Sequence, residues 1–243
     1  MPGLSVCMPA YNEEGNIADM VADVLTTMRP RFDDFEIVVT NDGSSDRTGQ
    51  VLEELARQHP ELKPVHHEVN QGYGAAVYTA LSHASKELIF FTDSDRQFKL
   101  EEIDRLLARM DEADMVVGYR APRRDPFLRV LFGWGWSALV TLLFGYTARD
   151  IDCAFKLFPR SLFQKVGPTV RSRGATFSAE FLVRTKRAGY KIAEVPVSHL
   201  PRRAGSPTGA RWDVISRAFR ELWQFRLQLW RESTARETRM ATD

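Results

Sequence analysis

The feature that most constrains the fold of this chain is an alternation, over the first 120 residues, of short apolar runs with segments of helical periodicity. The runs are Leu4–Met8, Phe35–Thr40, Leu62–His67, Leu88–Thr92 and Met115–Gly118, and the helical segments are Glu14–Met28, Asp46–Gln58, Tyr73–Ala84 and Leu100–Met110. Such alternation predicts an α/β fold in which a mostly parallel, Rossmann-like sheet is flanked by helices and joined by right-handed crossovers.

Polar, acidic or glycine-rich residues follow each of the first four predicted strands. These segments are Pro9–Glu13, Asn41–Asp46, Asn70–Gly74 and Asp93–Gln97. One such strand end could be a plain turn. Because the carboxyl ends of parallel strands meet at one edge of the sheet, where ligands bind in folds of this kind, four in register predict a binding site there.

Asp93-Ser94-Asp95 is the strongest candidate for chemistry in this chain. Alternate residues of an extended segment point the same way, so the two carboxylates can converge on one hard cation such as Mg²⁺ or Mn²⁺. Gln97 could add an amide oxygen, and a bound diphosphate would supply further oxygens. The alternative is a solvated acidic turn that caps the helix predicted to begin near Leu100.

Gly72-Tyr73-Gly74 is a weaker signal. It lacks the third glycine of a dinucleotide-binding loop, and it follows the third strand instead of the first. We expect a tight turn that lets the backbone approach a nucleotide sugar, with a purely structural turn as the alternative.

Taken together, these motifs resemble a family 2 glycosyltransferase with a GT-A fold. The segments that carry the resemblance are Val6–Glu13, Val39–Asp46, Asn70–Gly74 and Asp93–Gln97. Three later segments, Arg149–Phe158, Glu194–Val197 and Arg202–Ser206, are similar to the dolichyl-phosphate mannose synthase branch. Asn41 and Thr208 depart from the pattern, since the family often has aspartate at the first position and the mannose synthases often have lysine at the second.

The resemblance implies roles for individual residues, read position by position. Donor binding is implied for Pro9, Tyr11, Glu13, Asp42, Gly72, Asp93 and Ser94, and metal binding for Asp93, Asp95 and Gln97. A catalytic role is implied for Asp95, Arg120, Arg129 and Arg202, with the arginines near the donor or acceptor phosphates, and Asp150 is a further catalytic candidate whose individual role is open.

Other polar residues have open roles. Asp150 and Asp152 precede an apolar strand and are site candidates without assigned functions. Glu180, on the predicted helix Phe177–Gly189, either faces the acceptor or has a solvated or capping role. The histidines lack metal-ligand spacing, so they are expected at the surface or in loops; they include His66, His67, His83 and His199.

Charge is divided unevenly between the halves of the chain. Residues 1–115 have net charge −12 and residues 116–243 have net charge +13, which indicates different ligands for each half. Val130–Tyr146 contains no charged residue, but its seventeen residues and three glycines fit a membrane span poorly. We expect a pair of short interfacial helices there that receive a lipid chain, with a buried core helix or a dimer interface as the alternative.

The segment Arg211–Arg231 has the pattern of a basic amphipathic helix. It would suit an anionic lipid surface, or would pack on the catalytic domain or a partner, and the residues after Glu232 are expected to fray. The predicted domains are residues 1–210, a GT-A catalytic domain, and 211–243, an amphipathic helix and polar tail. Within the catalytic domain, 1–120 would bind the nucleotide and 121–210 would face the acceptor and membrane.

The expected function is that of an inverting hexosyltransferase that uses a nucleotide-diphosphate sugar, with mannose favoured and glucose next, and a polyprenyl or dolichyl phosphate acceptor. The N-terminus has no secretory signal pattern, so we expect a peripheral enzyme on the cytoplasmic face of a membrane, as a homodimer or with a downstream membrane glycosyltransferase. Alternatives are a soluble acceptor and a non-catalytic nucleotide-sugar-binding protein. A nucleic-acid partner is disfavoured because the basic residues interleave with an apolar run.

Overall fold

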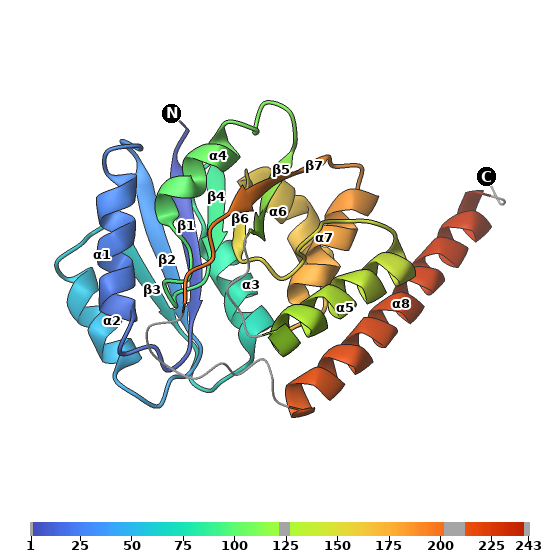
Figure 1. Ribbon diagram of the computed structural model, residues 1–243, viewed down its shortest axis with the longest axis horizontal. Helices are drawn as coiled ribbons and strands as arrows, with labels where there is room; N and C mark the ends of the chain where they lie inside the picture. Colours follow the sequence, from blue (N-terminus) through green and yellow to red (C-terminus); the bar gives the residue numbers. More distant parts are fainter. Residues whose placement is uncertain (1, 122–126, 202–211, 241–243) are drawn as a thin grey trace.

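The computed structural model describes residues 2–121, 127–201 and 212–240 (Figure 1). Its centre is a seven-stranded sheet in the order β3-β2-β1-β4-β6-β5-β7. The strands are β1 (Leu4–Ala10), β2 (Phe35–Asn41), β3 (Leu62–His66), β4 (Leu88–Thr92), β5 (Met115–Arg120), β6 (Phe155–Pro159) and β7 (Ile192–Val197). β6 runs antiparallel to both β4 and β5, and the other pairs are parallel.

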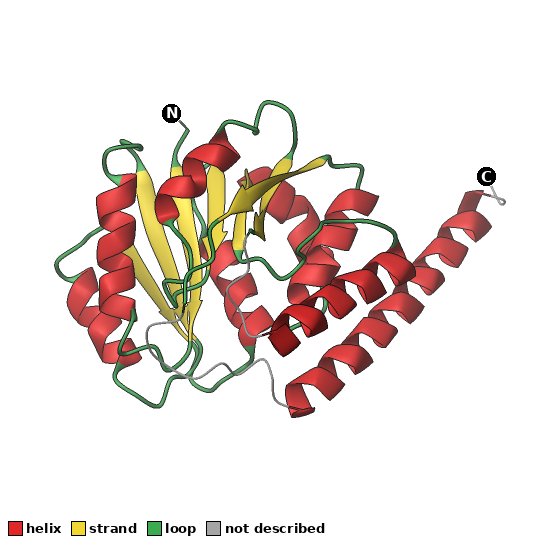
Figure 2. Cartoon of the chain, viewed as in Figure 1, coloured by secondary structure: helices red, strands yellow, loops and turns green. Residues whose placement is uncertain are grey.

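Helices cover both faces of the sheet, so the predicted α/β class is confirmed (Figure 2). They are α1 (Ile17–Met28), α2 (Thr48–Ala56), α3 (Tyr73–His83), α4 (Ile103–Leu107), α5 (Phe127–Phe144), α6 (Arg160–Val166), α7 (Phe177–Arg187) and α8 (Trp212–Met240), with short 3₁₀ turns η1 (Leu100–Glu102) and η2 (Gly167–Thr169).

Alternate strand residues divide the interior into two cores. Val6, Val39 and Phe90 face the core that contains α1, while Cys7 and Phe91 face the core that contains α3, α6 and α7. Side chains alternate along a strand, and a sheet with both faces covered needs apolar residues on both sides. This is why the first strands are continuous apolar runs.

Two of the helices predicted from the sequence have different bounds in the structure. The segment expected from Glu14 becomes helical only at Ile17, because the Glu14 amide donates to Asp46 and its carboxylate accepts from the Arg47 amide. These loop contacts replace the first helical turn. The helix expected over Leu100–Met110 is shorter, and consists of η1 followed by α4.

The uncharged segment Val130–Tyr146 was predicted to form a pair of short helices. This prediction is wrong, because α5 is one continuous helix. Its inner side packs on the core through the buried Val140, and α8 lies alongside it (Figure 1). The Phe144 and Phe225 rings stack at 4.8 Å, which joins the two helices. α8 also continues to Met240, beyond the expected fraying point at Glu232. In the described segments, none of the helices combines the length and the apolarity needed to cross a bilayer.

A buried carboxylate joins the strand ends on the side of the sheet away from the predicted site. Glu36 accepts hydrogen bonds from Ser5 Oγ (2.6 Å), the Ser85 amide (2.6 Å) and Lys63 Nζ (2.5 Å). Burial alone would raise its pKa, but these donors together lower the pKa of Glu36 to about 2. The ionised carboxylate therefore stabilises the junction of β1, β2 and β4.

Replacing Glu36 with Gln should lower the free energy of unfolding by about 2–3 kcal/mol at pH 7, because charge-assisted hydrogen bonds are lost. Since the folded-state pKa lies below the ordinary value of 4.5, the stabilisation is complete above that pH and is lost as the pH falls toward 2. Urea unfolding at pH 7 and pH 3.5 measures the difference between the two proteins, which should narrow at the lower pH. Equal stability at pH 7 would contradict this role.

Candidate active site

The carboxyl ends of β1, β2 and β4 lie at one edge of the sheet, as the strand pattern predicts. β6 runs the other way, so its beginning lies at the same edge, with Phe155 paired to Thr92. The segment before β6, which contains Asp150 and Asp152, is therefore brought next to the segment after β4, which contains Asp93. Asp93 and the two aspartates 57 and 59 positions later in the chain thus share one site.

Asp93 and Asp95 crowd each other at this edge. Burial and the charge of Asp95 raise the pKa of Asp93 to about 7, although the Tyr73 hydrogen bond and the positive charges of Lys156 and Arg120 act in the opposite direction. The Tyr73 hydroxyl donates to Asp93 Oδ1 at 3.0 Å. A cation bound between the two carboxylates would relieve the repulsion that raises the pKa of Asp93.

The donor set fits a divalent metal that is shared with a ligand. Among the described residues, no group of three or more His, Cys, Asp or Glu side chains is placed to hold a metal, so the protein offers the carboxylate pair. Gln97 Nε2 donates to the Leu200 carbonyl at 3.0 Å, which leaves the amide oxygen as the Gln97 atom that could reach a cation. A hard cation held by two carboxylates takes its remaining oxygens from water or phosphate.

The backbone around the carboxylate pair is held by its neighbours. Ser94 is buried, and its hydroxyl donates to the Pro9 carbonyl at 2.8 Å, which fixes the end of β4 against the end of β1. Arg96 has the positive φ of 59°, unusual for a residue with a side chain, and forms ion pairs with Asp23 and Asp19 of α1. These contacts stabilise the sharp turn that follows Asp95.

Asp42 organises the glycine-rich loop. Its carboxylate accepts from the backbone amides of Gln71 and Gly72, both at 2.9 Å, and from His67 Nδ1 at 2.7 Å. His67 also contacts Thr79 Oγ1 at 2.9 Å. His67 lies in the loop directly after β3, as expected, but its side chain is only 9% exposed, so it is not a surface residue. Its place directly after β3, at the same edge as Asp42, was the available signal.

Tyr11 and Glu13 follow β1 in different environments. Tyr11 is exposed at the edge, where its ring is accessible to a ligand. Glu13 is buried; its amide donates to Thr48 Oγ1 and its carboxylate accepts from Asn16. The structure thus places an aromatic ring at the edge on a loop that is fixed by buried polar contacts.

Arg120 and Asp150 form a bidentate ion pair near Asp93, close enough for the charge of Arg120 to act on the pKa of Asp93. Nε and Nη2 of Arg120 donate to the two Asp150 oxygens at 2.7 and 2.8 Å. Burial would lower the pKa of Arg120, but the hydrogen bonds and charge of Asp150 raise it above its ordinary value, so the guanidinium stays charged. A charged guanidinium that is held in place by its ion pair with Asp150 therefore lies beside the acidic edge.

Lys156 is a residue that the sequence reasoning missed. It is almost completely buried in β6, and its Nζ donates to the Cys153 carbonyl at 2.5 Å and the Ile151 carbonyl at 3.3 Å. Burial lowers its pKa, while the nearby carboxylates of Asp150 and Asp152 oppose that shift. A lysine inside an apolar strand was the signal. It holds the turn that presents the two aspartates.

Comparison with known proteins identifies the family of this chain. The family model described as Glycosyl transferase family 2 matches residues 5–167. The chain belongs to glycosyl transferase family 2. A dolichyl-phosphate beta-glucosyltransferase of Trichomonas vaginalis is 32% identical over 208 residues, which cover 78% of this chain and 61% of that protein. A dolichyl-phosphate hexose transferase of Haloferax volcanii is 30% identical over 203 residues, covering 82% and 83%.

Solved structures share the fold. Glucosyl-3-phosphoglycerate synthase from Mycobacterium tuberculosis, in complex with Mn²⁺, UDP and phosphoglyceric acid, aligns with a TM-score of 0.69 at 20% identity, and covers 93% of this chain and 78% of that one. This family 2 glycosyltransferase therefore has the GT-A fold. The chain spans only about three fifths of the length of the Trichomonas protein.

The structure of this family 2 glycosyltransferase does not describe the side chains of three residues that the sequence analysis named. Arg202 and Thr208 lie outside the described residues, and Arg129 lies in α5 with its side chain outside them. Glu180 is buried, and accepts from the Ser172 amide at 2.8 Å and from Arg184 at 2.7 Å. The solvated alternative for Glu180 is therefore wrong, and its observed role is to cap the turn before α7.

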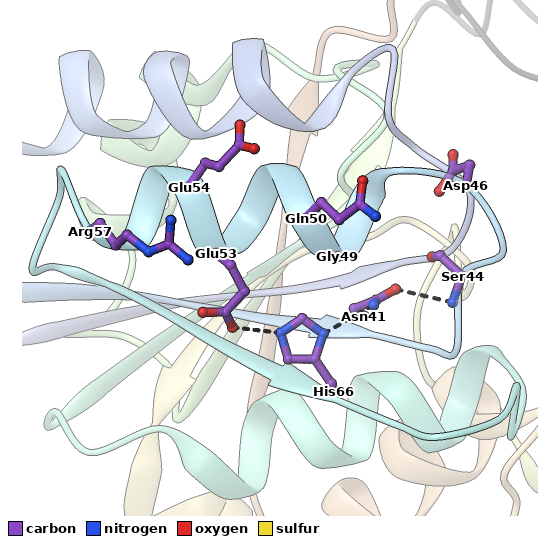
Figure 3. Close-up of a pocket in the computed structure, with 9 residues that line it drawn as sticks. All are labelled: Asn41, Ser44, Asp46, Gly49, Gln50, Glu53, Glu54, Arg57 and His66. Carbon is purple, nitrogen blue, oxygen red and sulfur yellow. Dashed lines mark hydrogen bonds and ion pairs between the residues drawn. The ribbon is translucent and has the colours of Figure 1, made fainter.

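An open groove of about 640 Å³ lies on the other side of β2 (Figure 3). Its wall contains the hydrogen-bonded series Asn41, His66 and Glu53, with contacts of 3.0 and 2.9 Å. The groove lacks the Asp93 and Asp95 pair of this family 2 glycosyltransferase. We therefore assign the candidate active site to the strand edge and not to the groove.

Replacing Asp93 with Asn should stabilise the metal-free protein at pH 8 by about 1–3 kcal/mol, because an ionised group with a raised folded-state pKa opposes folding. The penalty grows between pH 4 and pH 7 and is complete above pH 7, so the gain should vanish below pH 4. Thermal and urea unfolding in the presence of EDTA measure this difference in stability between the variant and the native protein.

The same variant should lose any stabilisation that Mn²⁺ and UDP give the native protein. Asp111→Asn, which changes an exposed carboxylate away from this edge, serves as the control and should alter neither result. A loss of stability for Asp93→Asn at pH 8 in EDTA would contradict the electrostatic account of the site.

Proposed function

We propose that this chain transfers a hexose from a nucleoside-diphosphate sugar to the phosphate of a polyprenyl phosphate, with inversion at the anomeric carbon. The observation that carries the proposal is the Asp93 and Asp95 pair at the strand edge, which lies beside the fixed Arg120 and Asp150 ion pair. This arrangement suits a metal-bound diphosphate on one side and an incoming phosphate on the other.

Glucose is the hexose we favour, ahead of mannose. The support is the relatives' names: the Trichomonas vaginalis protein and one of Saccharomyces cerevisiae are dolichyl-phosphate beta-glucosyltransferases, and the Haloferax volcanii protein is a dolichyl-phosphate hexose transferase. This reverses the order expected from the sequence, where mannose came first. The acceptor class stays as expected.

Each side chain has a separate task in the proposed reaction. Asp93 and Asp95, with the amide oxygen of Gln97, would hold Mg²⁺ or Mn²⁺, which when bound neutralises charge on a departing diphosphate. Asp42 shapes the loop at Gly72 for the nucleotide. The exposed ring of Tyr11 can stack on the base.

The acceptor needs orientation more than activation. A phosphate monoester is largely ionised near neutral pH, so it requires no dedicated base. Its oxygen forms a bond to the anomeric carbon while the bond from that carbon to the diphosphate oxygen breaks, and direct displacement inverts the configuration. Arg120, held by Asp150, would orient the attacking phosphate.

The outer sides of α5 and α8 support a membrane-bound acceptor. Large apolar side chains are exposed there, among them Trp134 (70%), Leu142 (82%), Trp223 (61%) and Trp230 (58%). Exposed arginines such as Arg220 lie on the same helix α8. Tryptophan and arginine together favour the interface of an anionic bilayer, so we propose peripheral binding at the cytoplasmic face.

Transfer from labelled UDP-glucose, GDP-mannose and UDP-N-acetylglucosamine to a polyprenyl phosphate, with Mn²⁺ or Mg²⁺ in detergent, tests the reaction. We expect lipid-extractable label from UDP-glucose, a β-linked product from the α-linked donor, and a loss of at least 100-fold for Asp95→Asn. Arg120→Lys keeps the charge but not the bidentate contact, and should lose about 10-fold or more. Donor binding without a lipid product would favour a soluble acceptor or a non-catalytic binding protein.

Replacing Trp223 and Trp230 together with Ser should weaken binding to vesicles that contain anionic lipid by about 10-fold, because two interfacial anchors are lost. Cosedimentation measures the binding, and UDP affinity should be unchanged because these residues lie outside the strand edge. Unchanged vesicle binding would contradict the membrane assignment. If the same variant converts a dimer to a monomer in sedimentation velocity, the surface belongs to a second copy.

A further inference from the structure

The turn at residues 172–174, between η2 and α7, lies between α8 and the glycine-rich loop of the candidate site. On one side, Ser172 Oγ donates to Glu221 Oε2 of α8 at 2.9 Å. On the other side, the Ala75 amide of α3 donates to the Arg173 carbonyl at 2.9 Å. One short turn therefore contacts both the outermost helix and the first turn of α3.

Neither contact leaves room for a side chain at the glycine that forms it. A Cβ added at Gly74 would lie 2.5 Å from the Gly174 carbonyl oxygen, and one added at Gly174 would lie 2.6 Å from Glu221 Oε1. Both distances are below any ordinary contact. The glycines at 74 and 174 thus let the carboxylate, the turn and the loop pack directly on one another.

The glycine-rich loop in turn determines where Tyr73 lies. Gly72 has φ of 101°, and its amide donates to Asp42, so the loop is fixed at its start. Ala75 fixes its end through the Arg173 carbonyl. Between these points, Tyr73 directs its hydroxyl to Asp93, one of the two candidate metal ligands.

We propose that Glu221 is a positioning residue for the donor site: through Ser172 it holds the 172–174 turn against the glycine-rich loop, and so holds Tyr73 on Asp93. The inference deepens the proposed function and rests on it only for the identity of the donor. In this proposal α8, which carries the exposed Trp223 and Trp230, also stabilises the donor site.

Removal of the Glu221 carboxylate should act locally. α8 is independently anchored by three side chains in the core, Leu222, Phe225 and Leu229, all of which are buried. The helix should therefore stay in place when Glu221 is truncated, while the turn loses the acceptor for Ser172. The consequence is a looser Tyr73 contact and weaker binding of a metal-bound nucleotide.

Calorimetric titration of UDP in the presence of Mn²⁺ tests this with three variants. Glu221→Ala should weaken UDP binding at least fivefold, and should raise the KM for the donor more than it lowers kcat. Glu221→Gln keeps an oxygen that accepts from Ser172, and should stay within twofold of the native protein. Gln224→Ala, an exposed position one turn further along α8, is the control and should have no effect.

A double-mutant cycle with Tyr73→Phe tests the route. If Glu221 acts through Tyr73, then Glu221→Ala should lower UDP affinity less than twofold when it is introduced into the Tyr73→Phe protein. The proposal would be overturned if the losses of UDP affinity in the two single variants multiplied in the double variant. It would also be overturned if Glu221→Ala bound UDP as tightly as the native protein. Should Glu221→Ala fail to fold, Ser172→Ala removes the donor of the same hydrogen bond and takes its place in the cycle, with the same criteria.

Hydrogen exchange separates this proposal from the proposed function. In the ligand-free protein, the Ala75 amide should exchange at least fivefold faster in Glu221→Ala than in the native protein, because the turn that carries its acceptor, the Arg173 carbonyl, loses the Glu221 contact and keeps only the Glu180 contact at Ser172. An unchanged rate overturns the positioning role. A native protein that binds neither UDP nor GDP overturns the proposed function, and the exchange result then stands by itself.

Discussion

The site depends on the pairing of β4 with β6 in opposite directions. A parallel sheet brings only strand ends to its binding edge, so segments that precede strands lie at the far side. Because Phe155 at the start of β6 pairs with Thr92 at the end of β4, the turn with Asp150 and Asp152 joins the edge with Asp93. The ion pair to Arg120, at the end of β5, follows from this reversal.

The electrostatics of the edge favour ligand binding over stability. Asp93 is forced toward a neutral form by burial and by Asp95, although Lys156 and Arg120 compensate part of the charge. At the other end of the sheet, the carboxylate of Glu36 has enough donors to stay ionised well below its ordinary pKa. The contrast is that the ionised form of Glu36 stabilises the fold, whereas the ionised form of Asp93 opposes it, which makes Asp93 the candidate for a functional role.

The sequence predicts elements that have strong periodicity, but it does not predict the position or role of a residue that depends on a single tertiary contact. The apolar runs and the residues after them were sufficient for β1 to β5 and for the edge that Asp42 and Asp93 share, because strand direction alone places these residues. They did not predict that β6 runs in the opposite direction. The half-buried position of His67 depends on its contacts with Asp42 and Thr79, and the role of Lys156 depends on the carbonyl of Cys153. Such contacts join elements whose packing no local pattern specifies. The continuous α5 was missed because its glycines favour a break, while packing against α8 favours one helix.

The most direct test of the central claim is the affinity of the native protein for Mn²⁺, measured by calorimetry with and without saturating UDP. If the edge supplies only two carboxylates and an amide, and the diphosphate supplies the rest, Mn²⁺ should bind weakly alone and at least tenfold more tightly with UDP. Linkage then requires that UDP affinity rise by the same factor when Mn²⁺ is present. Equal Mn²⁺ affinity in both conditions would contradict a metal site shared between this edge and a nucleotide.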